Sequence, residues 1–209
     1  MKQRGLFITF EGPDGSGKTT VATAVCEELK KRGYEVIHTR EPGGIEISEK
    51  IRNIILDPEN TMMDAKTEAL LYAASRRQHL VEKVFPAIRD GKIVICERFL
   101  DSSLAYQGYG RQLGFDEVLE INLFAIDRTY PDLTVYLDVD EQVGLDRLSS
   151  RNFKDRLDQE SIDFHHRVAQ GYREVLRRFK DRIRTVDASR GKEEVIADSL
   201  NRILELING

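Results

Sequence analysis

Residues 7–20 decide the fold of this chain and read Phe-Ile-Thr-Phe-Glu-Gly-Pro-Asp-Gly-Ser-Gly-Lys-Thr-Thr. A short apolar run breaks here into a glycine-rich loop with the spacing G-x-x-x-x-G-K-[ST], set by Gly12, Gly17, Lys18 and Thr19. In such a loop the backbone N–H groups turn toward phosphate oxygens, the lysine reaches the β- and γ-phosphates, and the hydroxyl holds Mg²⁺. An apolar strand before the motif and an amphipathic helix after it supply the context that the motif requires. The sequence therefore predicts a nucleoside triphosphate site.

Length, charge and cysteine content limit the class of protein. The 209 residues are enough for one well-buried domain, and no linker divides residues 1–209. The formal net charge of -4 argues against a nucleic-acid partner, which needs a basic surface. Cys26 and Cys96 have no metal-ligand spacing and favour a reducing compartment. Because the chain shows neither a signal peptide nor a membrane-length apolar run, we expect a cytoplasmic protein with no membrane partner.

Strand-like runs rich in Val, Ile, Leu or Phe alternate with helical patterns along the chain. Strands are expected at 5–10, 34–39, 92–96, 132–139 and 182–186. Helices are expected at 18–31, 45–56, 65–89, 115–126, 142–149, 159–179 and 192–207. This alternation predicts a three-layer α/β fold, a five-stranded parallel sheet with helices on both faces, whose ligands bind at the carboxyl ends of the strands. The polar segment 149–158 fits either a short mobile lid or an ordinary solvated loop.

Charged side chains follow the second and third predicted strands. Arg40 and Glu41 precede a Pro-Gly-Gly turn after the second strand, and Glu97 and Arg98 come directly after the third. An arginine at a strand end presents a planar donor fork that suits a phosphate, and a carboxylate beside the phosphate loop can orient Mg²⁺ through water. An ordinary surface ion pair is the alternative for Glu97 and Arg98. Their place at the carboxyl edge of the sheet favours the functional interpretation.

The long helix expected at 65–89 carries Tyr72 and Arg76 on one face. A ring for stacking and a guanidinium for a carbonyl would together form a platform for a nucleobase. A pair at this spacing is also common in ordinary helix packing, so the residues alone leave both interpretations open.

Taken together, these segments resemble bacterial thymidylate kinases over residues 6–206. The resemblance rests on the phosphate loop, Thr39-Arg40-Glu41-Pro42-Gly43-Gly44, Thr67-Glu68-Ala69-Leu70-Leu71-Tyr72-Ala73-Ala74-Ser75-Arg76, residues 101–108, and Arg156-Leu157-Asp158-Gln159-Glu160. The phosphate loop alone is generic, whereas the turn, the helix and the 101–108 stretch are specific to this family. The resemblance implies ATP-dependent phosphorylation of dTMP to dTDP on a P-loop nucleoside-monophosphate-kinase fold, in a homodimer.

The resemblance also implies a site for the acceptor, dTMP. By the family pattern Arg98 binds the acceptor phosphate, assisted by Arg52. Tyr72 takes the position of the ring stacked on thymine, and Arg76 that of the partner of its O4. The other implied acceptor residues are Ser103 and Gln107 at the thymine N3 edge, Tyr106 beneath C2′, and Asp14 and Glu41 near the sugar 3′-OH and the magnesium waters.

On the donor side, Lys18 is expected to neutralise charge on the transferred phosphate. The loop has no arginine at its variable positions, and the matching family subtype carries its phosphate-clamping arginine in the lid, here Arg151 or Arg156. Thr19 and Glu97 are the expected magnesium-side residues, although the family usually has aspartate where this chain has Glu97, so the longer acid changes the reach toward the metal. The predicted ATP loop comprises Gly12, Pro13, Asp14, Gly15, Ser16, Gly17, Lys18, Thr19 and Thr20.

Two other functions compete with this interpretation. A deoxynucleoside kinase, which phosphorylates a 5′-OH, typically has Glu-Arg-Ser after its third strand, and Glu97-Arg98 resembles that motif. The double glycine after Pro42, Arg52 and the Ser-Ser-Leu-Ala-Tyr-Gln-Gly stretch argue against it. A GTPase-like switch is disfavoured because the chain contains no Asn-Lys-x-Asp motif, and Asp-x-x-Gly occurs only inside the phosphate loop.

Overall fold

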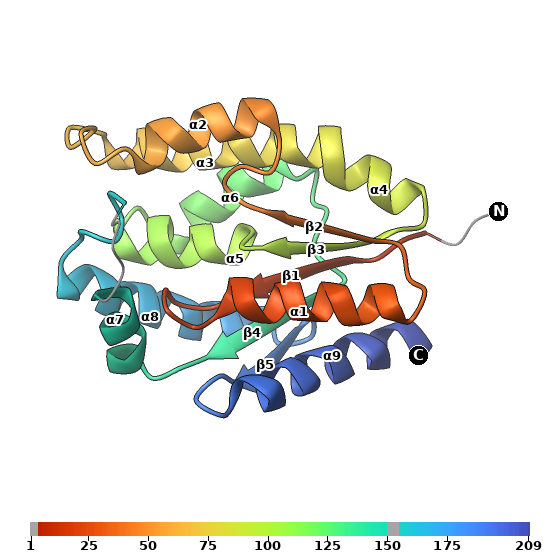
Figure 1. The fold of residues 1–209 in the computed structure, drawn as a ribbon. Helices are drawn as coiled ribbons and strands as arrows, with labels where there is room; N and C mark the ends of the chain where they lie inside the picture. The colour runs from red at the N-terminus through yellow and green to blue at the C-terminus, as the bar shows by residue number, and fades with distance from the viewer. Residues whose placement is uncertain (1–3, 150–154) are drawn as a thin grey trace.

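The structure, a computed structural model, describes residues 4–149 and 155–209 and is built around one parallel sheet (Figure 1). Its strands are β1 (Phe7–Glu11), β2 (Val36–Arg40), β3 (Ile93–Glu97), β4 (Leu133–Asp138) and β5 (Ile183–Asp187). They pair in parallel in the order β2-β3-β1-β4-β5. The predicted α/β fold with a five-stranded parallel sheet is therefore confirmed, and the predicted strand ends differ from the observed ones by one or two residues.

Helices cover both faces of the sheet, because successive side chains of a strand point to opposite sides and both sides are apolar. On one face Ile8, Phe10 and Val135 pack with apolar residues of α1 and α9. On the other face Phe7 and Val94 join a larger cluster with residues of α2 to α6 and of α8. The helices are α1 (Lys18–Lys31), α2 (Glu46–Leu56), α3 (Ala65–His79), α4 (Phe85–Arg89), α5 (Leu100–Ser103), α6 (Phe115–Ala125), α7 (Glu141–Ser149), α8 (Ile162–Arg178) and α9 (Lys192–Asn208).

Three helical regions differ from the prediction. The helix expected at 65–89 contains a π-helical turn, η1 (Leu80–Val84), between α3 and α4. Residues 100–110 form α5 and a second π-helical segment, η2 (Leu104–Gly110), where the sequence pattern indicates only a connection. Nearly every residue of this segment is buried, so it shows no amphipathic period. Finally, α8 begins later than expected because the Ser161 side chain accepts a hydrogen bond from Phe164 N and caps the helix there.

The arrangement brings the carboxyl ends of β1, β2 and β3 together beside the start of α1, with α7 and α8 close to the same end of the sheet (Figure 1). This is the edge at which ligands of parallel sheets bind. Within residues 4–149 and 155–209, no helix combines the length and the apolar character that crossing a membrane requires.

Candidate active site

The phosphate loop joins β1 to α1 and takes a shape that only glycine permits at two positions. Gly12 has φ +142, and a Cβ there would lie 2.6 Å from the carbonyl oxygen of Leu137. Gly15 has φ +78, and a Cβ there would lie 2.4 Å from the carbonyl oxygen of Gly144. A side chain at either position would push the loop off β4 or α7. The loop thus ends at the first turn of α1, whose N–H groups and dipole favour an anion.

Lys18 lies in the first turn of α1 and folds back over the loop. Its Nζ donates to the carbonyl oxygens of Gly12 (3.0 Å) and Pro13 (2.7 Å) and to Ser16 Oγ (3.3 Å). Burial, together with the nearby positive charge of Arg98, lowers the pKa of Lys18 to about 7. Negatively charged phosphate oxygens in the loop would accept stronger hydrogen bonds from this ammonium than the two carbonyl oxygens do. Lys18 is therefore positioned to bind an anion.

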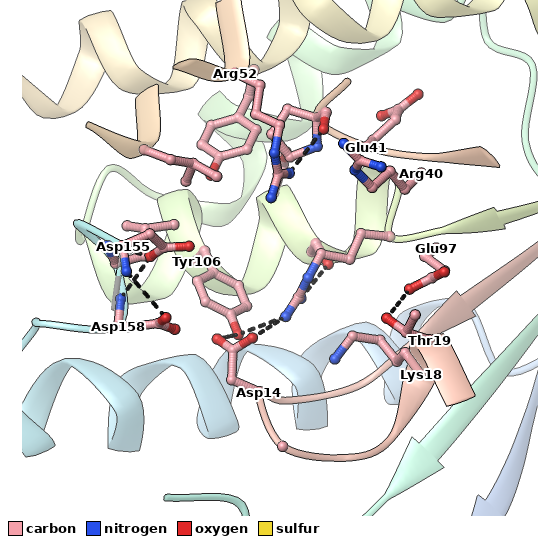
Figure 2. Close-up of a pocket in the computed structure, with 18 of the residues that line it drawn as sticks. Asp14, Lys18, Thr19, Arg40, Glu41, Arg52, Glu97, Tyr106, Asp155 and Asp158 are labelled. Carbon is pink, nitrogen blue, oxygen red and sulfur yellow. Dashed lines mark hydrogen bonds and ion pairs between the residues drawn. The ribbon is translucent and has the colours of Figure 1, made fainter. Parts of the chain in front are cut away.

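A cavity of about 390 Å³ opens beside the loop at the carboxyl edge of the sheet (Figure 2). Its lining includes Lys18 and Thr19 at the start of α1, next to the loop. Further lining residues come from β2, β3, α2, α3, α5, η2 and α7 and from the segment that begins at Asp155. Every residue predicted for the acceptor lines this one cavity: Asp14, Glu41, Arg52, Tyr72, Arg76, Arg98, Ser103, Tyr106 and Gln107. The structure therefore gathers side chains that are spread over more than ninety positions of sequence, from 14 to 107.

Arg98 reaches the cavity from the turn after β3, where its φ of +64 is unusual for a residue with a side chain. Its guanidinium donates to Asp14 Oδ1 (2.5 Å) and Ser102 Oγ (3.0 Å) and lies over the Tyr106 ring. Tyr106 in turn donates to the other oxygen of Asp14, 2.6 Å away. Since Arg98 pairs with Asp14, and Glu97 pairs with His38, the alternative of a surface Glu97–Arg98 ion pair is wrong.

A buried carboxylate that the sequence did not single out holds the turn carrying Arg98. Glu11, the last residue of β1, accepts from Phe99 N (2.7 Å) and from the hydroxyl of Ser102 (2.6 Å). Burial, reinforced by the negative charge of Asp101, raises the pKa of Glu11 to about 7. The sequence signal that could have identified Glu11 is a charged residue at the end of a strand with no other charged residue.

Arg76 is buried in the cavity wall, with 2% of its surface exposed. Its Nε donates to Glu41 Oε2 (2.7 Å), and its Nη1 donates to Ser103 Oγ (3.0 Å) and to Asn122 Oδ1. The other oxygen of Glu41 lies 2.9 Å from His79 Nδ1. Arg76 is therefore fixed by a buried ion pair that reaches from α3 to the end of β2, and it does more than pack within its own helix.

Gln107 is oriented by a second buried carboxylate, Glu68, which also escaped the sequence analysis. Gln107 Nε2 donates to Glu68 Oε1 (2.9 Å), and Glu68 forms ion pairs with Arg111 (3.0 Å) and Arg156 (2.5 Å). Hydrogen bonds from these partners outweigh burial and lower the pKa of Glu68. Since its amide nitrogen is engaged in this way, Gln107 turns its amide oxygen toward other partners.

The structure does not place Arg156 where the lid prediction puts it. Its Nε donates to the Ile55 carbonyl oxygen (2.8 Å), and with Glu68 it ties the segment before α8 to α2 and α3. It is not among the residues that line the cavity, whereas Arg147 of α7 is, and donates to the Gly15 carbonyl oxygen (3.0 Å). The other predicted lid arginine, Arg151, lies outside the described residues.

Oxygen donors for a cation meet at the start of α1. The hydroxyl of Thr19 donates to Glu97 Oε2 across 2.5 Å (Figure 2). Hydrogen bonds from His38 and Thr19 outweigh burial and lower the pKa of Glu97, so this acid is ionised. A hydroxyl and a carboxylate are hard oxygen ligands of the kind that Mg²⁺ prefers, and the donor set therefore fits this ion.

Comparison with known proteins agrees with this geometry. The family model described as Thymidylate kinase matches residues 10–198. The chain belongs to the thymidylate kinase family. A thymidylate kinase of Bacillus velezensis is 58% identical over 205 residues, covering 97% of each chain. That of Clostridium novyi is 54% identical, covering 93% of this chain and 96% of its own.

A solved structure agrees at the level of the fold. The crystal structure of thymidylate kinase from Ehrlichia chaffeensis superposes with a TM-score of 0.79 at 32% identity, over 96% of this chain and 99% of that one. The chain is thus a kinase, a phosphotransferase, and its sheet and phosphate loop are those of the P-loop NTPase fold.

Proposed function

We propose that this chain transfers the γ-phosphoryl group of ATP to the 5′-phosphate of dTMP and releases dTDP and ADP. The observation that carries the proposal is the shared cavity, in which the phosphate loop faces two arginines and a buried base-reading set. A single nucleoside-monophosphate-kinase domain over residues 1–209 would contain the whole reaction.

The acceptor phosphate is assigned to Arg98 and Arg52. Arg98 lies beside the phosphate loop through its contact with Asp14, and Arg52 donates to the Pro42 carbonyl oxygen (2.9 Å) at the same cavity. Two planar donor forks can hold one phosphate in line with the γ-phosphoryl group without any general base. Lys18 neutralises the charge that develops on the transferred group.

Thymine is assigned to the wall formed by Tyr72, Arg76 and Gln107. The Tyr72 ring would stack on the base, and the fixed guanidinium of Arg76 would donate to O4. Because Glu68 engages the amide nitrogen of Gln107, its amide oxygen is the group that would accept the N3–H of thymine. Ser103 would complete this edge, and Tyr106 would lie beneath C2′, where it disfavours a ribose hydroxyl.

Thr19 and Glu97 would hold Mg²⁺ and its waters beside the donor phosphates. When bound, the ion would supply positive charge that offsets the charge of the donor phosphates. The hydrogen bond that the Thr19 hydroxyl donates keeps Glu97 directed at the first turn of α1, where the ion would bind. Of the two predicted lid arginines, Arg156 is engaged by Glu68 and the Ile55 carbonyl oxygen, so Arg151, which lies outside the described residues, stays the predicted contributor to the clamp.

A homodimer is part of this proposal. Three helices that contact one another in sequence, α2 with α3 and α3 with α6, carry exposed apolar side chains: Ile47 and Ile54 of α2, Leu70 of α3 and Phe124 of α6. Exposed apolar groups of this size mark interaction surfaces, and light scattering should report a mass that Phe124→Glu halves. The buried free thiols of Cys26 and Cys96 suit the cytoplasm as its compartment.

An ADP-release assay against dTMP, dUMP, dCMP, dAMP and thymidine tests the proposal. We expect dTMP to be the best acceptor and dUMP, which lacks one methyl group, to be poorer by roughly 10- to 200-fold. Equal turnover of dTMP, dCMP and dAMP would remove the base assignment. Thymidine accepted as well as dTMP would instead support a deoxynucleoside kinase.

A further inference from the structure

Glu97 has a partner outside the nucleotide cavity, His38 in the middle of β2. His38 Nε2 donates to Glu97 Oε1 (2.9 Å), while Glu97 Oε2 accepts from Thr19 (2.5 Å). One carboxylate thus joins three elements, β2, β3 and α1.

The sheet register explains why these residues meet. β2 and β3 pair in parallel with His38 opposite Ile95 and Arg40 opposite Glu97. Since residues two apart in a strand share a face, all four side chains lie on the face that α1 covers. The Cβ of His38 is then a diagonal neighbour of Glu97, a distance that only long side chains span.

His38 reaches Glu97 from the side away from the nucleotide. A second cavity of about 370 Å³ is lined by His38, Thr39, Glu49 and Lys83, and it shares Arg40 and Glu97 with the main cavity. Of the two cavities His38 lines only the second, and its hydrogen bond to Glu97 links it to the wall of the first. The side chain of His38 is 28% exposed and that of Glu97 is 12% exposed, so their hydrogen bond is partly shielded from water.

We propose that His38 is a positioning residue that holds the carboxylate of Glu97 against Thr19 at the start of α1. The inference rests on the proposed magnesium-side role of Glu97. A carboxylate fixed at both oxygens presents its remaining lone pairs to metal-bound water in one orientation, whereas an untethered glutamate samples several rotamers.

The test replaces His38 with Leu, which keeps the bulk of the strand residue and removes the donor. We expect the Mg²⁺ concentration for half-maximal turnover to rise roughly tenfold, with the KM for dTMP unchanged. His38→Gln, whose amide nitrogen can occupy the Nε2 position, should restore most of the loss. By calorimetry, affinity for ADP with Mg²⁺ should fall, and affinity for ADP in EDTA should stay within about twofold of the wild type, since the phosphate loop is untouched.

A double-mutant cycle separates positioning from general damage. In a Glu97→Asp background the shorter acid cannot span Thr19 and His38 together, so His38→Leu should have no further effect on the Mg²⁺ requirement. An equal effect in both backgrounds, or a loss of ADP affinity in EDTA, would overturn the proposal. His166→Ala serves as a control, because it removes another histidine–glutamate pair, with Glu141, and neither residue lines the two cavities.

The Glu97→Gln variant distinguishes an error in the role of His38 from an error in the proposed magnesium-side role of Glu97. If Glu97→Gln leaves the Mg²⁺ requirement unchanged, the magnesium-side role of Glu97 is wrong. If it raises the requirement and His38→Leu does not, only the positioning role of His38 is lost. Melting temperatures accompany each variant, and His38→Ala offers a second donor-free side chain should the leucine variant fold poorly.

Discussion

The donor and acceptor sides of the cavity are built in different ways. The donor side is one contiguous loop, residues 12–20, whose shape follows from glycine φ angles and the start of α1. The acceptor side is assembled from β2, α2, α3, β3 and η2, and buried ion pairs such as Arg76–Glu41 join the pieces. Mutations on the donor side should therefore lower the rate of phosphoryl transfer without destabilising the fold. Damage to the acceptor side should affect recognition and stability together.

The largest expected effect tests the first half of that comparison. Lys18→Ala should lower kcat by a factor of 1,000 or more, roughly, because the lysine stabilises charge on the transferred group in a largely dry site. The melting temperature should stay within a few degrees, since the hydrogen bonds of Lys18 go to the phosphate loop itself. Lys30→Ala, an exposed lysine later in the same helix, is the matched control. Retention of a tenth of wild-type turnover would exclude Lys18 from the mechanism.

Arg76→Ala tests the second half of the comparison, in which changes on the acceptor side affect dTMP recognition and stability together. Removing this guanidinium leaves Glu41 buried with only His79 as its ionisable partner, so we expect a loss of roughly 3–5 kcal/mol in the free energy of unfolding. The KM for dTMP should rise at the same time, while the KM for ATP changes little. The neighbouring Arg77 pairs with the exposed Asp127, so Arg77→Ala should leave both quantities nearly unchanged. An Arg76→Ala protein with normal stability and weakened dTMP binding would break the link between recognition and folding.

The structure disagrees with the lid prediction at Arg156. Because its guanidinium is buried against Glu68, Arg156→Ala should lower the free energy of unfolding by about 2 kcal/mol, a reduced cost since Arg111 still compensates Glu68. Arg177→Ala, which removes an exposed pair with Glu174, should cost far less. Urea unfolding and steady-state kinetics together decide the role. A hundredfold loss of kcat at unchanged stability would instead show that Arg156 stabilises the transition state, as the lid prediction has it.

The last prediction concerns the pH dependence of stability through Glu11, an effect that is spread over several pH units. Its pKa is raised from 4.5 to about 7 in the folded chain, so the folded state holds more protons than the unfolded state between these values. Stability contributed by this group is then present below pH 4.5 and is lost as pH rises through 7, by roughly 3 kcal/mol at most. Glu11→Gln should flatten that part of the stability–pH curve in urea unfolding. Glu193→Gln, at an exposed carboxyl of α9, should leave the curve unchanged, and an unchanged curve for Glu11→Gln as well would contradict the assignment.

Arg98, Tyr72 and Arg76 could be raised as candidates from the residues alone, whereas most of the other acceptor residues could be proposed only through the family resemblance. Nothing in the order of residues shows that Arg76 meets Glu41 or that Gln107 meets Glu68, since these pairs are separated by 35 and 39 positions. The residues that were missed, Glu11, Glu68 and Asn122, share one property. Each is a polar side chain buried inside an otherwise ordinary strand or helix, and its partner comes from another element.

The sequence by itself determined the features that depend on neighbouring residues. Glycine spacing sets the phosphate loop, alternating apolar runs set five parallel strands, and Lys18–Lys31 was predicted with its observed ends because loop and helix share one motif. Only the tertiary structure decided which charges meet: Arg98 with Asp14, Glu97 with His38, and Arg156 with Glu68. The reason is physical. Local conformation follows from backbone sterics within a few residues, whereas a buried charge takes whichever opposite charge the packing of distant elements brings within reach.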